Sequence, residues 1–249
     1  MIDFRNKKII ITGASGGIGR SLVEKFINLN GTVLATGTKS EKLELLKKNF
    51  PTVNTLKFDI SEHSKIDEFI DNASDLIGGI DVLVNSAGVR LSGNLETTPL
   101  NEWTYHFNNN VTGTFLACKY ALPLLKKGKQ SSIVNLASIN SIRGAKNMLA
   151  YATSKSALIS FTASLALDLT KHNIRVNAVA PGAIDTPMLA SFKKDLTLKE
   201  YEKRMQENHP IGRIGKPKEV ASVIYFLASE AASFMTGLTL PVDGGRSIR

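Results

Sequence analysis

Seven short runs rich in β-branched residues alternate along the chain with longer amphipathic stretches. This alternation is typical of βα units that feed a parallel sheet. The expected strands are Lys7–Thr12, Thr32–Thr36, Val53–Asp59, Asp81–Asn85, Ser132–Ala137, Ile174–Ala180 and Leu238–Val242. The expected helices include Ile18–Leu29, Ser64–Ile77, Leu100–Leu125, Tyr151–Lys171 and Pro217–Ser229. We therefore predict an α/β fold with a doubly wound, seven-stranded parallel sheet, helices on both faces, and a ligand outside the carboxyl ends of the strands.

Length and composition favour a single domain over residues 1–249, because the chain can bury one large core and shows no low-complexity stretch. The first residues lack the apolar stretch of roughly 7–15 residues that a secretory signal needs. No run approaches the roughly 18 apolar residues of a membrane span. The single Cys118 cannot form an internal disulfide, and mid-helix it is expected to be buried. We expect a cytoplasmic protein with no membrane partner.

The formal net charge of +9 raises the question of a nucleic-acid partner. The cations are dispersed in small groups near expected helix ends and loops, where solvated lysines are common. Histidines 63, 106, 172 and 209 lack metal-ligand spacing, so solvated or capping positions are expected for them. Neither a nucleic acid nor a metal is therefore expected.

A glycine-rich segment, TGASGGIG at 12–19, lies where the first strand gives way to a helix. Four glycines there let the backbone approach a pyrophosphate at a helix N-terminus. The spacing is T-G-x-x-x-G-x-G rather than G-x-G-x-x-G. A tight turn without a ligand is the alternative, and the strand before it and the helix after it favour the phosphate site.

A second group consists of Ser138, Tyr151 and Lys155. A tyrosine titrates near pH 10, so acid/base work near neutrality needs a cation that favours its phenolate. Tyr151 and Lys155 are four residues apart and share a helix face. Ser138 ends a strand and can donate a hydrogen bond to a substrate oxygen.

With these motifs together, the chain resembles the short-chain dehydrogenase/reductase family, in its single-domain branch of this length, over essentially its whole length. The matching motifs are TGASGGIG at 12–19, Asp59, NSAG at 85–88, NNNVTG at 108–113, Ser138, YATSK at 151–155, NAVAPGAIDTPM at 177–188 and a terminal TGLTLPVDGG. The family's N-N-A-G reads NSAG here, and a serine that hydrogen-bonds locally can support the same turn. The resemblance implies a Rossmann-type sheet and an NAD(P)-dependent oxidoreductase.

The resemblance also implies roles for individual residues. Gly13, Ser15, Gly17 and Gly19 would line the pyrophosphate, with Ile18 nearby; Asp59 and Ile60 would hold the adenine; Asn85, Ala87 and Gly88 would flank the adenosine ribose; and Pro181, Gly182, Ile184 and Thr186 would seat the carboxamide end of the nicotinamide. The hydride would pass directly between nicotinamide and substrate carbon.

The catalytic roles follow in the same way. Tyr151 would be the general acid/base, and Lys155 would bind the nicotinamide ribose and lower the Tyr151 pKa. Ser138 would polarise the carbonyl. Asn110, chosen among three consecutive asparagines because the following Val-Thr-Gly fixes the register, would hold a water that relays protons from Lys155.

Cofactor choice depends on the end of the second strand, which reads Thr36-Gly37-Thr38-Lys39 without an acid. An NAD enzyme usually carries a carboxylate there, whereas a 2′-phosphate is helped by a cation and hydroxyl donors. We therefore expect a preference for NADP(H) over NAD(H), with Thr38 and Lys39 at the phosphate. Gly16 is evidence against this preference for NADP(H), since many NADP-linked relatives carry a basic residue at that position.

Other activities remain open. A non-catalytic cofactor-binding regulator would lose the acid/base residues, which are intact here, whereas an isomerase or dehydratase on the same fold is harder to exclude. A 3-oxoacyl-acyl-carrier-protein reductase is the main alternative to a dehydrogenase of small polyols, sugars or hydroxy acids. The substrate is expected between loops 89–99, 139–150 and 187–210, the last covering it.

Two further expectations concern partners. Family members are mostly tetramers, so a homotetramer formed through Leu100–Leu125 and Tyr151–Lys171 is expected, with further contacts near the C-terminal strand. Arg90, Arg143 and Lys146 lie in loops that open on the carboxyl edge of the sheet. They suggest a small anionic substrate, although solvated positions are the alternative.

Overall fold

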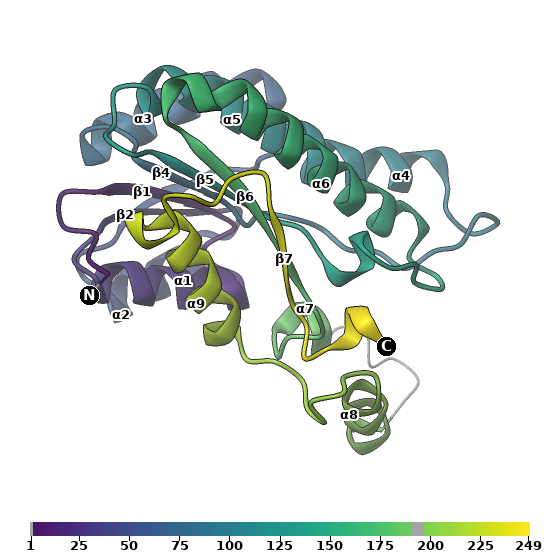
Figure 1. Ribbon diagram of the computed structural model, residues 1–249. Helices are drawn as coiled ribbons and strands as arrows, with labels where there is room; N and C mark the ends of the chain where they lie inside the picture. The colour runs from purple at the N-terminus through teal and green to yellow at the C-terminus, as the bar shows by residue number, and fades with distance from the viewer. Residues whose placement is uncertain (1, 191–196) are drawn as a thin grey trace.

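The computed structural model describes residues 2–190 and 197–249 and is built around one parallel sheet (Figure 1). The strand order is β3-β2-β1-β4-β5-β6-β7, and every neighbouring pair is parallel. The strands are β1 Lys8–Thr12, β2 Thr32–Gly37, β3 Asn54–Lys57, β4 Val82–Asn85, β5 Ser132–Leu136, β6 Arg175–Pro181 and β7 Thr239–Val242. The predicted seven-stranded sheet is confirmed, with strand ends shifted by one or two residues.

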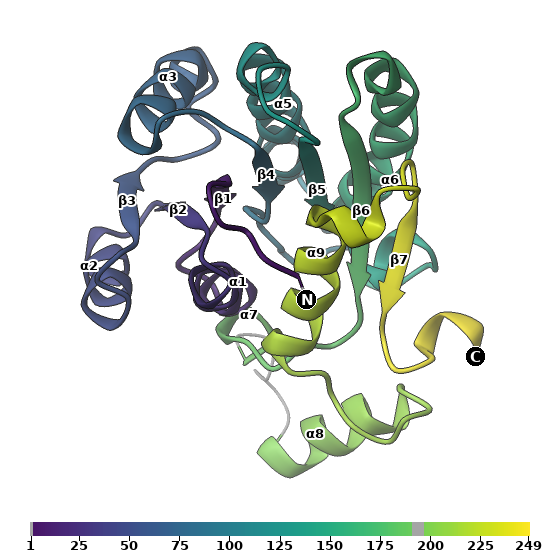
Figure 2. The same cartoon turned by 60° about the vertical axis from the view of Figure 1, so that its left-hand side comes forward.

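Helices cover both faces of the sheet (Figure 2). The larger ones are α1 Gly17–Asn28, α2 Ser40–Asn49, α3 Ile66–Ile77, α4 Leu100–Phe107, α5 Gly113–Leu125, α6 Leu149–Leu169, α8 Leu198–Glu207 and α9 Pro217–Ala228. The layers α1, α2 and α9 on one side and α3, α5 and α6 on the other enclose the strands. Helices α2 and α8 were not among those predicted from the sequence.

The two cores follow from the alternation of side chains along each strand. Ile9 and Ile11 of β1 pack with Leu22 and Phe26 of α1, whereas Ile10 between them packs with Ile70 on the opposite face. All six side chains are fully buried. Strands buried on both faces are therefore nearly continuous apolar runs, as expected for a parallel sheet.

The strand order reverses at β1, which pairs with β2 on one side and β4 on the other. At such a switch point the connections leave in opposite directions, so the carboxyl ends of the two strands open a crevice. The loop after β1 and the loop after β4 therefore face each other across it. This is the edge where a dinucleotide is expected.

Short helices lie beyond the carboxyl ends of β6 and β7, at the lower side of Figure 1. Here α7 (Pro187–Ala190) and α8 belong to the expected covering segment 187–210, of which residues 191–196 lie outside the described part of the chain. The remaining short helices are η1 His63–Lys65, the π-helical η2 Asn108–Thr112, η3 Ile139–Ser141, η4 Thr170–His172, η5 Glu230–Ala232 and η6 Arg246–Ile248. Across residues 2–190 and 197–249, no helix is long and apolar enough to cross a membrane.

Candidate active site

The glycine loop between β1 and α1 is shaped by close backbone approach. Gly13 adopts φ +64°, and a Cβ built on it would lie 2.7 Å from the Cα of Ala87. A Cβ on Gly17 would lie 2.5 Å from Cγ2 of Thr186. Glycine is therefore required where this loop meets the turn after β4 and the segment after β6.

A cavity of about 410 Å³ opens at this loop. Of the residues expected at a dinucleotide, it is lined by Gly13, Ser15, Gly17, Ile18, Gly19, Thr38, Asp59, Ile60, Ala87, Gly88 and Thr186. Thr36 also lines it, and its buried hydroxyl has no hydrogen-bond partner among the described residues. A glycine cradle at a helix N-terminus with an unpaired hydroxyl beside it fits a bound dinucleotide phosphate and ribose.

Two expected cofactor residues, Lys39 and Asn85, do not line this cavity. Lys39 is exposed and precedes α2, whereas Lys42 on the first turn of α2 lines the cavity. Asn85 is buried within the sheet, where its amide donates to Asn135 Oδ1 at 2.9 Å and to Cys118 Sγ at 3.3 Å. Both were predicted to bind the cofactor because of their positions in the chain. In the structure, neither side chain lines this cavity.

A second cavity, of about 610 Å³, adjoins the first and shares Ile18, Gly88 and Thr186 with it. Ser138, Tyr151 and Lys155 all line this cavity, so the structure brings the predicted catalytic group together. Pro181, Gly182 and Ile184 line it as well. The two cavities together form a continuous space from the glycine loop to Tyr151.

Tyr151 lies 8% exposed on the first turn of α6. Burial raises the pKa of its phenol, while a hydrogen bond with Ser138 and the nearby Arg90 cation lower that pKa. Lys155, one turn further, is 4% exposed, and its ammonium donates to the carbonyl of Leu136 at 2.6 Å. Burial lowers the pKa of Lys155 to about 8, so this lysine is largely protonated at neutral pH.

Asn110 lies in the π-helical segment η2, which interrupts the expected continuous helix Leu100–Leu125. Its side-chain oxygen accepts from the amide of Val89 at 2.8 Å, and its side-chain amide donates to Ser154 Oγ at 2.9 Å. Asn110 thereby links the loop after β4 to α6, between Tyr151 and Lys155. A single-turn π-helix at a functional site is a recurrent device.

His106 and His209 were expected in solvated or capping positions, and this prediction was wrong, because both are buried. His106 accepts from the amide of Leu91 at 2.9 Å, and its ring lies 6.3 Å from the Tyr151 ring. His209 accepts from the amide of Ala183 at 3.0 Å, and burial lowers its pKa. Each imidazole binds the backbone of a segment that borders the second cavity, and no spacing pattern in the sequence marks such a role. Cys118 is buried as expected, and burial raises its pKa to about 12.

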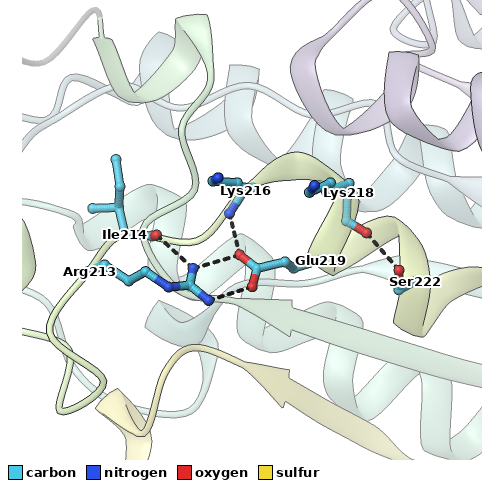
Figure 3. A network of polar contacts seen from close by, with 6 residues as sticks. All are labelled: Arg213, Ile214, Lys216, Lys218, Glu219 and Ser222. Atoms are coloured by element: carbon cyan, nitrogen blue, oxygen red, sulfur yellow. Dashed lines mark hydrogen bonds and ion pairs between the residues drawn. The ribbon is translucent and has the colours of Figure 1, made fainter.

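A polar network fixes the wall that follows β6 (Figure 3). Arg213 forms a bidentate pair with Glu219, at 2.7 and 2.8 Å, and Glu219 also accepts from the amide of Lys216 at 2.7 Å. Gly215, which directly precedes Lys216, exchanges backbone hydrogen bonds with the 183–185 segment. The start of α9 therefore supports the segment that carries Ile184.

Comparison with known proteins gives consistent matches over nearly the full chain. The sequence pattern of the family described as enoyl-(acyl carrier protein) reductase matches residues 13–247. The chain is 35% identical to the 3-oxoacyl-[acyl-carrier-protein] reductase of Aquifex aeolicus, covering 98% of both proteins.

Two solved structures are similar to it as well. One is the aldohexose dehydrogenase of Thermoplasma acidophilum, with a TM-score of 0.91 and 36% identity, covering 99% of this chain and 96% of that one. The other is a short-chain dehydrogenase/reductase described as glucose/ribitol dehydrogenase from Brucella melitensis, with a TM-score of 0.91, 37% identity and 98% coverage of both chains.

Proposed function

Because this chain belongs to the short-chain dehydrogenase/reductase family, we propose that Tyr151 is the general acid/base of its reaction, with Ser138 and Lys155 beside it. The protein is an oxidoreductase that uses NAD(P) and interconverts a carbonyl and a secondary alcohol on a small substrate. The observation that carries the residue assignment is the cavity that Ser138, Tyr151 and Lys155 line together, next to the glycine-lined cavity.

The three side chains divide the work at the substrate oxygen. When bound, the nicotinamide supplies the hydride for reduction or accepts it in oxidation. Ser138 donates a hydrogen bond to the carbonyl oxygen and orients it. Tyr151 delivers its phenolic proton to that oxygen during reduction and removes it during oxidation. Lys155 favours the phenolate by its charge and holds the nicotinamide ribose hydroxyls.

The cofactor residues belong to the same proposal. The pyrophosphate, adenine and nicotinamide contacts remain those expected from the family resemblance, and Asn110 remains the residue proposed to hold the relay water. The buried hydrogen bonds of Asn110 to Val89 and Ser154 add a positioning role. Asn85 acts through the sheet, by its contact with Asn135.

For the dinucleotide itself, the enzyme prefers NADP(H). Thr38 and Lys42 supply a hydroxyl and a cation at the end of β2, and no acidic side chain except Asp59 lines the described part of that cavity. Lys39, exposed at the start of α2 and outside the cavity lining, is a secondary cation for the phosphate in this proposal. A 2′-phosphate is stabilised by such donors and repelled by a carboxylate.

The chain acts as one domain over residues 1–249 in a homotetramer, with residues 187–210 covering the substrate. Support for assembly comes from apolar side chains on the outer helices, where Leu167 of α6 is 77% exposed and Phe115 of α5 is 45% exposed. Phe234 and Ile248, on either side of β7, are also exposed. The cytoplasmic location stays a prediction from the sequence.

The experiment that tests this function combines NADPH with a panel of ketones, aldehydes and a neutral 3-oxoacyl thioester. Net oxidation of NADPH is expected, and Tyr151→Phe is expected to reduce turnover by at least about 10² while cofactor binding persists. More than about a tenth of the wild-type activity in Tyr151→Phe would contradict the assignment. Product without net oxidation would indicate an isomerase instead. Preferred turnover of the thioester would favour the alternative that the Aquifex relative represents, a carrier-protein reductase.

A further inference from the structure

Besides Lys155, five cationic side chains from separate parts of the chain line the cavity that contains Tyr151. Arg90 follows β4, Arg143 and Lys146 follow η3, Arg204 belongs to α8, and Arg246 lies in η6 near the C-terminus. The first three were expected here from their loops, whereas Arg204 and Arg246 were missed. Their sequence positions are remote, and only the tertiary structure brings them to this cavity.

The described residues that line this cavity include no aspartate or glutamate. The Asp243 carboxylate acts on Arg246, and its charge opposes the lowering of the Arg246 pKa by burial, Arg143 and Arg90. Both Asp243 oxygens are engaged by backbone, one by the amide of Gly245 at 3.0 Å and the other by that of Ser247 at 2.6 Å. Within the described lining, positive charge therefore gathers in the cavity without an acidic side chain beside it.

Arg246 is held in place by the turn that precedes it. Gly244 and Gly245 adopt φ +60° and +85°, and a Cβ on Gly244 would lie 2.5 Å from Cγ2 of Ile211. The guanidinium of Arg143 donates to the carbonyl of Arg246 at 2.6 Å. Gly244, Gly245 and Arg143 thus fix the backbone at Arg246, whose partly buried side chain lines the cavity.

Arg90 extends this positive region to the proposed catalytic group. Its guanidinium carbon lies 5.9 Å from the centroid of the Tyr151 ring, and the side chain is half-buried. Arg90 and Arg246 are close enough for each charge to act on the other. Both arginines line the cavity that also contains Tyr151, so an anionic group bound to them would share that cavity with the reacting carbon.

We propose that the arginines Arg90 and Arg246, with Arg143 supporting the latter, form a binding site for a carboxylate or phosphate group of a small hydroxy or oxo substrate. The proposal rests on the proposed function, since it places the reacting carbon at Tyr151. Guanidinium groups bind these anions through paired, charge-assisted hydrogen bonds. Lys146 and Arg204, both exposed, form the rim of this site and attract the anion from solvent.

Calorimetric titration of the enzyme loaded with oxidised dinucleotide tests the site directly, because no reduction can then occur. The probes are matched anionic and neutral pairs: pyruvate with pyruvamide, acetoacetate with acetoacetamide, and dihydroxyacetone phosphate with dihydroxyacetone. At least one anionic member is expected to bind about tenfold or more tightly than its neutral partner. The pair that shows the preference identifies the anion as a carboxylate or a phosphate.

Variants assign that preference to the arginines. Arg90→Gln combined with Arg246→Gln is expected to abolish it, Arg246→Lys to retain part of it, and Lys129→Gln, at the opposite edge of the sheet, to leave it unchanged. Thermal melting shows whether each variant is folded; if the double variant is not, Arg246→Gln alone must weaken the preference. A preference below about tenfold in all three pairs, or one that survives these substitutions, overturns the proposal.

Steady-state kinetics separate this proposal from the acid/base assignment. In Tyr151→Phe the anion preference is expected to persist although turnover is lost. If the anion preference is absent while neutral ketones are turned over in a Tyr151-dependent way, the anion site is overturned and the acid/base assignment stands. A higher kcat/KM for the neutral acetoacetyl thioester of N-acetylcysteamine than for every anionic substrate overturns it as well.

Discussion

The guanidinium of Arg90 lies 5.9 Å from the centre of the Tyr151 ring, and its charge lowers the pKa of that tyrosine. Burial acts in the opposite direction and is the stronger influence. The tyrosine therefore depends on its neighbours for a phenolate near neutral pH. Besides Lys155, which the sequence motif pairs with Tyr151, the fold supplies a second cation from the loop after β4.

Replacement of Arg90 by glutamine is expected to raise the Tyr151 pKa. Alcohol oxidation needs the phenolate, so the acidic limb of its kcat/KM profile moves to higher pH and the rate at neutral pH falls. A neutral alcohol such as 2-butanol is the substrate of choice, because anion binding then plays no part. Arg90→Lys serves as the charge-retaining control. An unchanged limb in Arg90→Gln would show that Arg90 does not act on Tyr151.

The cofactor preference predicts a difference between two neighbouring lysines. Lys42→Gln is expected to lower kcat/KM for NADPH by about tenfold, because one charge-assisted contact to the 2′-phosphate is lost, with little effect on NADH. Lys39→Gln is the matched control and is expected to change the ratio less, since Lys39 does not line the cavity. A wild-type enzyme with a higher kcat/KM for NADH than for NADPH would disprove the preference.

The Arg213–Glu219 pair predicts a pH-dependent contribution to stability. The Arg213 guanidinium and the amide of Lys216 hold the pKa of Glu219 at about 2, below its ordinary 4.5. The stabilisation is therefore complete above about pH 4.5 and is lost as the pH falls towards about 2. Both side chains are over a third exposed and the pair is screened by solvent, so Arg213→Gln is expected to lower the stability at pH 7 only slightly.

Chemical denaturation at pH 7 and at low pH measures this contribution. The difference between Arg213→Gln and wild type should shrink as Glu219 becomes protonated. Lys218→Gln removes a positive charge from the same turn and leaves the pair intact, so it controls for net charge. An equal difference at both pH values would argue against the ion pair as the cause.

Assembly predicts a mass near four times the 27.0 kDa of one chain in light scattering. Leu167→Asp on α6 is expected to lower that mass, because an apolar side chain that is 77% exposed in one chain would be buried between helices of two chains. Leu45→Asp on α2, also an exposed apolar residue, is the control. A wild-type mass near 27.0 kDa would contradict the tetramer.

Local sequence patterns were enough to predict the sheet and the chemical groups of the candidate site. Runs such as Ile9-Ile10-Ile11 specify a strand buried on both faces, and the i, i+4 spacing of Tyr151 and Lys155 specifies a shared helix face, because both patterns are local. The glycines at 12–19 were equally readable, since the residue type itself reports close backbone approach.

Which remote side chains meet at the site could be seen only in the tertiary structure. His106 and His209 were expected in solvated or capping positions, yet each is buried against a backbone amide of another segment. Arg246 reaches the cavity of Tyr151 only because the turn at 243–245 and Arg143 hold it there. Lys42, in the first turn of α2, lines the first cavity, whereas Lys39, the residue before that helix, does not. Such contacts depend on side-chain direction and on chain segments 15 or more residues apart, and no local pattern carries that information.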